Sequence, residues 1–233
     1  MIDIFFKLAL IVVVGYLIGS FPSAVVISRK FFGFDIRDKG SGNMGSTNAF
    51  RVLGWKWGIT VQVLDILKGV LAVALASYIG YGIDLGHHTW FEDITLIKML
   101  GGAAAVSGHI WSLFVHFRGG KGINTAAGML VAIAPIDVGI AVGIFIIAVI
   151  FSGYISLGSI SAAFALPSSM FVRYNILHVD IQGYQIIIYF SIALSLLLIY
   201  AHRSNIRRLL VGAENRFDKL QLIKCKSHHK KSI

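Results

Sequence analysis

Long apolar runs alternate with short polar segments along most of this chain. The runs cover residues 4–28, 58–81, 96–117, 123–151, 155–172 and 184–201. About 20 apolar residues in an α-helix are enough to cross the hydrocarbon core of a bilayer. The pattern therefore predicts an all-α, polytopic membrane helical bundle.

The composition agrees with a membrane protein and excludes a water-soluble enzyme. Hydrophobic residues make up 56% of the chain and charged residues 14%, against about 25% charged residues in soluble domains. The mean hydropathy is +0.77. The lone cysteine, Cys225, excludes an internal disulfide and a cysteine-cluster metal site. We expect residues 1–233 to form one integral membrane domain with a basic tail at about 217–233.

The charges differ between the polar segments, and this difference predicts the orientation. Segment 29–57 and the tail from residue 202 are rich in Lys and Arg, whereas segment 82–95 carries Asp84, Glu92 and Asp93. Lys and Arg mark cytoplasmic loops. We therefore expect the two basic segments to be cytoplasmic and the N-terminus to lie outside. The formal charge of +10 then reports topology rather than nucleic-acid binding.

An outside N-terminus and a cytoplasmic C-terminus require an odd number of crossings, but six apolar runs are present. Run 123–151 contains Pro135 beside Asp137 near its middle, where a helix breaker is expected to divide it. Its halves, 123–134 and 137–151, bring the expected number of transmembrane helices to about seven. The polar stretch 152–159, which contains Ser156, then becomes a cytoplasmic loop.

The segment with the strongest anion-binding pattern is residues 40–51. Its glycines permit positive φ and a close approach of backbone N–H groups to an anion. Hydroxyls, amides and one guanidinium accompany them, from Ser41, Asn43, Thr47, Asn48 and Arg51. A solvated loop is the alternative. A dinucleotide fingerprint is rejected, since no strand precedes the glycines.

A second candidate segment, residues 108–125, ends one apolar run and begins the next. Arg118 and Lys121 lie among Gly119, Gly120 and Gly122, at the expected N-terminus of a helix. Helix N-termini favour anions, although a Walker A loop would need Ser or Thr after the lysine. His109 and His116 are expected on one helical face, as structural histidines rather than metal ligands.

The third candidate segment, residues 202–216, follows the last apolar run. His202 and Asn205 share a face if the helix continues, and both could then contact one substrate. The cations Arg203, Arg207 and Arg208 are interpreted as anchors to anionic lipid headgroups.

Two other polar pairs are given no catalytic role. His88 and Asp93 have the His-x4-Asp spacing of many glycerolipid acyltransferases, but they fall in the segment expected outside. Asp65 and Lys68, within an apolar run, are interpreted as a buried pair, although charges inside a membrane span always suggest function.

Together, the three segments closely resemble the bacterial acyl-phosphate:glycerol-3-phosphate acyltransferase family. The resemblance rests on Gly40-Ser41-Gly42-Asn43-x-Gly45-x-Thr47-Asn48-x-x-Arg51, on Gly108-His109 through Phe117-Arg118-Gly119-Gly120-Lys121-Gly122, and on His202-Arg203-x-Asn205 with Gly212-x-Glu214-Asn215-Arg216. It covers nearly the whole chain. It implies a seven-helix enzyme of the bacterial inner membrane with a cytoplasmic active site. We expect the enzyme to be a monomer and to need no cofactor or metal.

The resemblance also implies the reaction and the site residues. A fatty acyl group would pass from acyl phosphate to the 1-hydroxyl of glycerol 3-phosphate, giving lysophosphatidic acid and phosphate. The implied catalytic residues are Ser41, Arg51, Lys121, His202 and Asn205. The implied substrate-binding residues are Gly42, Asn43, Thr47, Asn48, Gly120, Ser156 and Glu214.

Direct attack by the substrate hydroxyl is expected, because acyl phosphate is a mixed anhydride with a good leaving group. An acyl-Ser41 intermediate is the alternative, and the proton acceptor is either His202 or a substrate phosphate oxygen. The chain departs from the family pattern at Ser112, Arg118, Ile123, Asn124 and Ala213. The rival function is a membrane transporter of a small anion, which should show an internal repeat; none is found.

Overall fold

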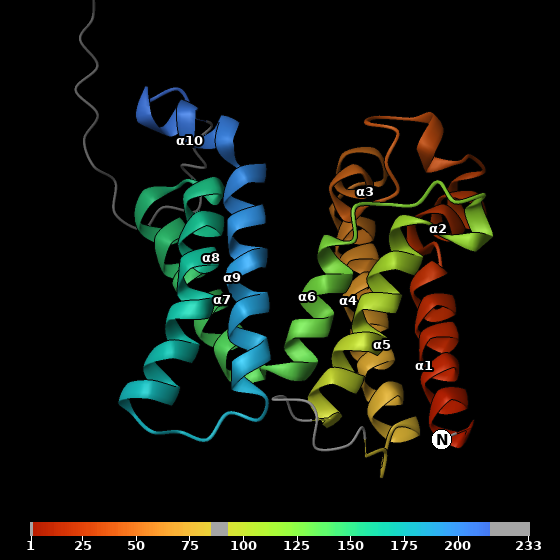
Figure 1. The fold of residues 1–233 in the computed structure, drawn as a ribbon. Helices are drawn as coiled ribbons and strands as arrows, with labels where there is room; N and C mark the ends of the chain where they lie inside the picture. Colours follow the sequence, from red (N-terminus) through yellow and green to blue (C-terminus); the bar gives the residue numbers. More distant parts are fainter. Residues whose placement is uncertain (1, 85–92, 215–233) are drawn as a thin grey trace, which may run out of the picture. The chain divides into compact units, whose positions relative to one another are not determined.

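The computed structural model describes residues 2–84 and 93–214, and the regular elements among them are all helices. The chain divides into two compact units, Met1–Pro135 and Ile136–Ile233 (Figure 1). The predicted all-α class is confirmed. Each unit is built from helices and short turns, as expected where backbone groups cannot bond to water.

The first unit contains the long helices α1, α4 and α5 and several shorter elements around their ends. In chain order these are α1 (Ile2–Ser20), α2 (Ser23–Phe32), η1 (Ile36–Asp38), α3 (Ser46–Leu53), α4 (Trp55–Ile79), α5 (Asp93–Ile110), η2 (Leu113–Val115) and α6 (Ile123–Ile133). The run predicted over residues 4–28 is divided at Phe21 and Pro22 into α1 and α2. Pro22 cannot donate the hydrogen bond that would continue α1.

Glycines allow the helices of this unit to pack backbone against backbone. A side chain at Gly19 of α1 would overlap the backbone of Ala105 in α5, and one at Gly108 would overlap the Tyr16 carbonyl. A side chain at Gly69 of α4 would overlap the Thr125 carbonyl in α6. Such small-residue contacts are typical of helix pairs in membranes, where lipid is as apolar as Leu and close packing supplies the attraction.

The predicted break at Pro135 is confirmed. Helix α6 ends at Ile133 and α7 begins at Pro135. With 11 residues, α6 is about 17 Å long, much shorter than the roughly 30 Å hydrocarbon core. It packs on α4 and α5, which satisfies the condition under which a short span is tolerated.

The second unit is an up-and-down arrangement of three longer helices followed by a short one. Its elements are α7 (Pro135–Ser152), α8 (Ile155–Phe171), the π-helix η3 (Val172–Ile176), α9 (Tyr184–Ala201) and α10 (Arg203–Leu210). Asp137 of α7 is buried and accepts hydrogen bonds from Arg173 and from Ser169. Ser195 Oγ of α9 donates to the Ala163 carbonyl of α8 at 2.6 Å.

By length and composition, five helical segments in the described residues could cross a membrane, and a sixth is obtained if the bent pair Tyr184–Tyr200 and Arg203–Leu210 counts as one. The chain is therefore a multi-pass membrane protein in agreement with its hydropathy. The predicted loop over residues 152–159 is wrong. α8 already begins at Ile155, so only Gly153 and Tyr154 separate it from α7.

Candidate active site

A cavity of about 280 Å³ lies in the first unit where α3 and α6 begin. It brings together the first two candidate segments, which are separated in the sequence by residues 52–107. Its lining residues are Ser41, Asn43, Gly45, Ser46, Thr47, Asn48, Arg51, Asp65, His109, Lys121, Gly122, Ile123 and Asn124.

Asn48 organises the first segment of this cavity. Its side chain is 1% exposed. Its Nδ2 donates to the carbonyls of Lys39 and Asn43 at 3.0 and 2.9 Å, and its Oδ1 accepts from Ser41 N at 2.9 Å. A side chain at Gly40, where φ is +63°, would overlap Asn48 Oδ1. Asn48 therefore shapes the loop from within and also lines the cavity, and its role in substrate binding stays a prediction.

Two helix N-termini face the cavity. α3 starts after Gly45, whose N–H donates to Asn43 Oδ1 at 2.8 Å, and α6 starts after Gly122, which has φ +76°. Asn124 Nδ2 donates to Ser46 Oγ at 2.9 Å and so joins the two helix starts. The unpaired N–H groups at such termini attract anions.

Two cationic side chains contribute to the same wall. Arg51 lies in the last turn of α3, and Lys121 directly precedes Gly122 at the start of α6. Both residues are exposed and line the cavity. Two cations and two helix N-termini together make the cavity chemically suited to phosphate, because Arg supplies a planar fork of donors and Lys a compact charge.

The turn that carries Lys121 is bound to the end of α5. Gly119 N donates to the Ile110 carbonyl at 3.1 Å, and Gly120 N donates to the His109 carbonyl at 3.0 Å. A side chain at Gly119 would overlap both of these carbonyls. The glycines of the second segment are thus required for this close approach, and their N–H groups are bonded to protein.

Buried polar residues form the inner part of the wall. Asp65 Oδ1 accepts from Ser23 Oγ at 3.0 Å and lies 2.9 Å from Lys68 Nζ, which also donates to the Phe21 carbonyl. His109 Nδ1 is 3.8 Å from the same Asp65 oxygen. The predicted Asp65–Lys68 pair is confirmed, since these side chains are only 2% and 6% exposed.

An ion-pair network braces the loop outside the cavity. Asp35 pairs with Arg29 and Arg37 at 2.8 and 2.7 Å, and Arg37 also donates to the Val115 carbonyl. Hydrogen bonds, first from Arg37 and then from Arg29, hold the pKa of the Asp35 carboxyl well below its usual range. Arg37 thereby links η1, which precedes the first candidate segment, to η2.

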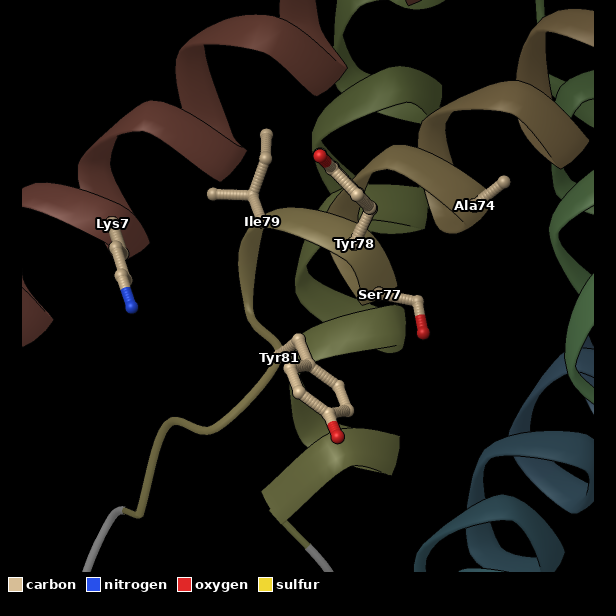
Figure 2. A pocket seen from close by; sticks show the side chains of 6 residues that line it. All are labelled: Lys7, Ala74, Ser77, Tyr78, Ile79 and Tyr81. Atoms are coloured by element: carbon tan, nitrogen blue, oxygen red, sulfur yellow. The ribbon is translucent and has the colours of Figure 1, made fainter.

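A second hollow, of about 650 Å³, lies where α4 ends. Figure 2 shows its lining residues, Lys7, Ala74, Ser77, Tyr78, Ile79 and Tyr81. Lys7 is the charged residue among them, and it pairs with Asp3 at 3.6 Å. Although this hollow is larger, it has one neutralised cation and no helix N-terminus among its lining residues, so we assign the chemistry to the smaller cavity.

The structure brings together most of the predicted residues of the first unit. Ser41, Asn43, Thr47, Arg51 and Lys121 line the cavity with Asn48. Gly42 and Gly120 shape the backbone instead: Gly42 has φ +71°, and Gly120 packs on the His109 ring. The sequence analysis did not select several lining residues, namely Ser46, Asp65, His109, Gly122, Ile123 and Asn124. For Asp65 the signal was present, as a carboxylate within an apolar run.

The remaining predicted residues belong to the second unit. The helix does not continue past α9, because it bends by 58° at His202. His202 Nδ1 contacts the Leu198 carbonyl at 2.9 Å, and Asn205 Nδ2 donates to Glu214 Oε1 at 2.8 Å. The condition set for His202 and Asn205 in the sequence analysis, a helix that continues past the last apolar run, is therefore not met.

Glu214 closes the end of α10. Its Oε2 accepts from Arg208 Nε at 2.6 Å, and the side chain is 7% exposed. Hydrogen bonds from Arg208 and then from Asn205 lower the pKa of the Glu214 carboxyl from its usual 4.5 to about 2, and Ser156 contributes to the same effect. Ser156 and Glu214 therefore lie close together within this unit, where Ser156 belongs to the first turn of α8.

Two expectations about histidines have different outcomes. His116 does not share a helical face with His109, because α5 ends at Ile110 and His116 follows η2 with φ +56°. Ser112 supports this change of direction, since its buried hydroxyl donates to the Ser20 carbonyl.

His88 lies outside the described residues. Among the residues that the structure does describe, no group of His, Cys, Asp and Glu could hold a metal ion.

The fold and the cavity define a multi-pass helical membrane protein whose first unit holds a cavity with the chemistry to bind an anion. A family model described as "Glycerol-3-phosphate acyltransferase" matches residues 9–212. The chain belongs to the glycerol-3-phosphate acyltransferase family and is an acyltransferase. The family resemblance inferred from the three sequence segments is thus confirmed.

Individual relatives agree with this assignment. The glycerol-3-phosphate acyltransferases of Chlorobium chlorochromatii (strain CaD3) and Chlorobaculum tepidum are 41% and 42% identical, over 88% of this chain and 95% and 94% of their own lengths. Two crystal structures of PlsY (YgiH), an integral membrane glycerol 3-phosphate acyltransferase, are similar with TM-scores of 0.66. They represent its glycerol 3-phosphate and lysophosphatidic acid forms, are 35% and 34% identical, and cover 91% of this chain and 96% of that one.

Proposed function

We propose that this enzyme transfers a fatty acyl group from acyl phosphate to the 1-hydroxyl of glycerol 3-phosphate, releasing lysophosphatidic acid and inorganic phosphate. The family assignment supports glycerol 3-phosphate as the acceptor. The two PlsY structures, described as glycerol 3-phosphate and lysophosphatidic acid forms, support the acceptor and the product. The acyl-phosphate donor rests on the resemblance of the three sequence segments.

One observation carries the proposal: the starts of α3 and α6 meet Arg51 and Lys121 in a single cavity. A phosphate placed there would receive backbone N–H groups from helix N-termini and two positive charges. Ser41 and Thr47 offer hydroxyl groups beside it. We propose that this cavity binds a phosphate group of the substrates, with Ser41, Arg51 and Lys121 as the residues that contact it.

The chemical step needs little covalent help from the protein. The hydroxyl oxygen of glycerol 3-phosphate attacks the acyl carbonyl carbon and forms the new ester C–O bond. The C–O bond to the phosphate breaks, and the phosphate leaves with the electron pair. The hydroxyl proton passes to His202 or to a phosphate oxygen. Alignment of the reactants and neutralisation of the phosphate charge are then the main contributions of the enzyme.

We further propose seven crossings, with the N-terminus outside, the C-terminus inside, and the site at the cytoplasmic face of the inner membrane. The basic character of residues 29–57 and of the chain from residue 202, set against the acidic segment 82–95, supports this orientation. The short helix α6 would count as one crossing. Arg51 and Lys121, which line the cavity, would then both face the cytoplasm, where glycerol 3-phosphate is dissolved.

Roles for the second unit stay predictions from the resemblance. His202 and Asn205 are expected at the reaction centre, with Ser156 and Glu214 as binding residues in one domain of 233 residues. The Asn205–Glu214 hydrogen bond supports a different task for Glu214, which is to hold Asn205 in place. We propose this positioning role for Glu214 in preference to direct substrate binding.

The test uses the purified chain in lipid vesicles with palmitoyl phosphate and labelled glycerol 3-phosphate. We expect labelled lysophosphatidic acid and an equal amount of released phosphate. Palmitoyl-CoA in place of palmitoyl phosphate should give no product. Product from the thioester alone would overturn the donor assignment, and isolation of acylated Ser41 by mass spectrometry would overturn direct transfer.

A further inference from the structure

A buried histidine in the cavity wall has no role in the step described above. His109 is 3% exposed and lies in the last turn of α5. We propose that His109 is a positioning residue: its ring supports the turn Gly119–Gly120–Lys121 and thereby keeps Lys121 at the cavity. This inference rests on the proposed function, because it takes Lys121 to be a phosphate ligand.

The backbone of the turn is held at two points. Gly119 N and Gly120 N donate to the carbonyls of Ile110 and His109 at 3.1 and 3.0 Å. These bonds hold the turn against the end of α5 through main-chain atoms, and one side chain also packs against the turn. That side chain is the imidazole of His109.

The imidazole fills the space next to the turn completely. A Cβ atom built on Gly120 would overlap His109 Nε2 and would also crowd Cδ2 and Cε1 at 3.0 Å. Contacts this close mean that the ring and Gly120 are in direct van der Waals contact. Lys121 follows Gly120 directly, so any shift of Gly120 toward an emptied ring position moves the lysine as well.

The opposite edge of the ring faces Asp65 on α4. His109 Nδ1 lies 3.8 Å from Asp65 Oδ1, and within the described residues Nδ1 has no hydrogen-bond partner. Ser23 and Lys68 hold the carboxylate from other directions. A neutral ring with its proton on Nδ1 is attracted to this oxygen, although 3.8 Å is too long for a hydrogen bond. The ring thus connects the buried pair on α4 with the turn that carries Lys121.

The charge balance favours a neutral ring that acts by position. Lys68 already neutralises Asp65 in the same buried cluster. A protonated His109 would add an uncompensated positive charge beside Lys68 in an interior site, which is costly. His109 therefore acts through the geometry of Lys121, and its loss should weaken phosphate binding more than it slows the chemical step.

The first measurement compares KM and kcat for His109→Ala with those of the wild-type chain in vesicles. We expect KM for glycerol 3-phosphate to rise roughly tenfold, while kcat changes less than about threefold, as for a cation displaced from its ligand. His116→Asn is the matched control. His116 is exposed, lies outside the cavity wall, and has a positive φ that Asn tolerates, so its KM should stay at the wild-type value.

The second measurement tests the contact between the His109 ring and Gly120 directly, by adding a methyl group at Gly120 and removing the ring at His109. Gly120→Ala places a methyl group where the ring is, so it should raise KM strongly. The double variant His109→Ala with Gly120→Ala has room for that methyl group and should recover part of the lost affinity. Recovery is the result that a merely stabilising histidine would not give, because two independent losses would add.

The outcomes separate the inference from the proposed function. If the wild-type chain and His116→Asn form product while His109→Ala keeps its wild-type KM, the inference is wrong and the proposed function stands. Additive losses in the double variant would also overturn the inference. If the wild-type chain itself forms no lysophosphatidic acid from palmitoyl phosphate, the proposed function fails first.

His109→Gln is the control for misfolding of the His109→Ala variant. Because glutamine fills most of the ring volume, this variant should keep KM closer to the wild-type value than His109→Ala does.

Discussion

Asn124 Nδ2 donates a hydrogen bond of 2.9 Å to Ser46 Oγ, and this bond joins the first turn of α6 to the first turn of α3. The two residues are 78 positions apart in the chain. Both belong to the cavity wall. In the proposed function each of these helix starts would present N–H groups to the phosphate, and the bond would then set the distance between the two halves of that site.

Removing this bond should weaken substrate binding without unfolding the protein. For Asn124→Ala we expect KM for glycerol 3-phosphate to rise by roughly three- to tenfold, corresponding to about 1 kcal/mol for one partly buried hydrogen bond. Ser46→Ala should give a similar rise. In a double-mutant cycle the effects should fall short of additivity, and fully additive effects would show that the bond does not couple the two helix starts.

The two cations should be the most sensitive positions of the cavity. Arg51→Ala and Lys121→Ala should each reduce kcat/KM by about a hundredfold or more, since each removes a proposed charged ligand of the released or the retained phosphate. Arg118→Ala is the matched control, because Arg118 is an exposed cation of the same turn outside the cavity wall. His88→Ala should likewise stay active. Activity of the Lys121→Ala enzyme near the wild-type level would remove the phosphate site from this cavity.

Asn48→Ala should affect the fold of the loop before it affects chemistry. The variant loses the hydrogen bonds to Ser41 N and to the carbonyls of Ile36, Lys39 and Asn43. Because these groups become buried and unpaired, we expect a loss of roughly 2 kcal/mol or more in unfolding free energy.

Thermal unfolding in detergent measures this loss, and Asn43→Ala serves as the comparison. Asn43 accepts one bond, from Gly45 N, so its loss should be about 1 kcal/mol. An Asn48→Ala protein that is as stable as the Asn43→Ala protein would contradict the organising role of Asn48.

The buried pair of α4 should tolerate joint removal better than the loss of one partner. Lys68→Met leaves the Asp65 carboxylate uncompensated in the interior, which costs about 3–5 kcal/mol. The double variant Asp65→Asn with Lys68→Met has no buried charge and should be more stable than Lys68→Met alone. Thermal unfolding in detergent distinguishes them, and equal stability would mean that the pair is not coupled.

Glu214 should make the end of α10 sensitive to acid. Hydrogen bonds from Arg208 and Asn205 lower its pKa from 4.5 to about 2, so the folded state binds the proton less tightly than the unfolded state. The stabilisation is present above about pH 4.5 and is lost as the pH falls towards 2.

The stability difference between the wild-type chain and Glu214→Gln, measured by thermal unfolding, should therefore shrink over that pH range. The pKa of Asp35 is also lowered, by Arg37 and Arg29 of the first unit. Because Asp35 is present in both proteins, its titration contributes equally to both and cancels from the difference. A difference between wild type and Glu214→Gln that is constant from neutral pH to pH 2 would contradict the role of Glu214.

The sequence alone determined the membrane class, the positions of the long helices and about half of the residues that line the cavity. In lipid, apolar runs of about 20 residues can satisfy the hydrogen bonds of their backbone only as helices. Helix α9 (Tyr184–Ala201) has the same bounds as the predicted run 184–201. The break at Pro135 could also be predicted, because a proline beside a charged residue in the middle of a long apolar run favours a helix boundary there. Ser41, Arg51 and Lys121 were found from residue type and glycine spacing.

Only the tertiary structure decided which other residues lie beside these three in the cavity wall. His109 resembled an ordinary buried histidine, and Asn124 a departure from the family pattern, until the packing of α5 and α6 placed both in the cavity wall. The end of α5 at Ile110 was likewise hidden, since Ser112 bonds to Ser20 across 92 positions. Local patterns report the burial of a helix face, whereas contacts across such separations depend on how closely glycines let the helices approach.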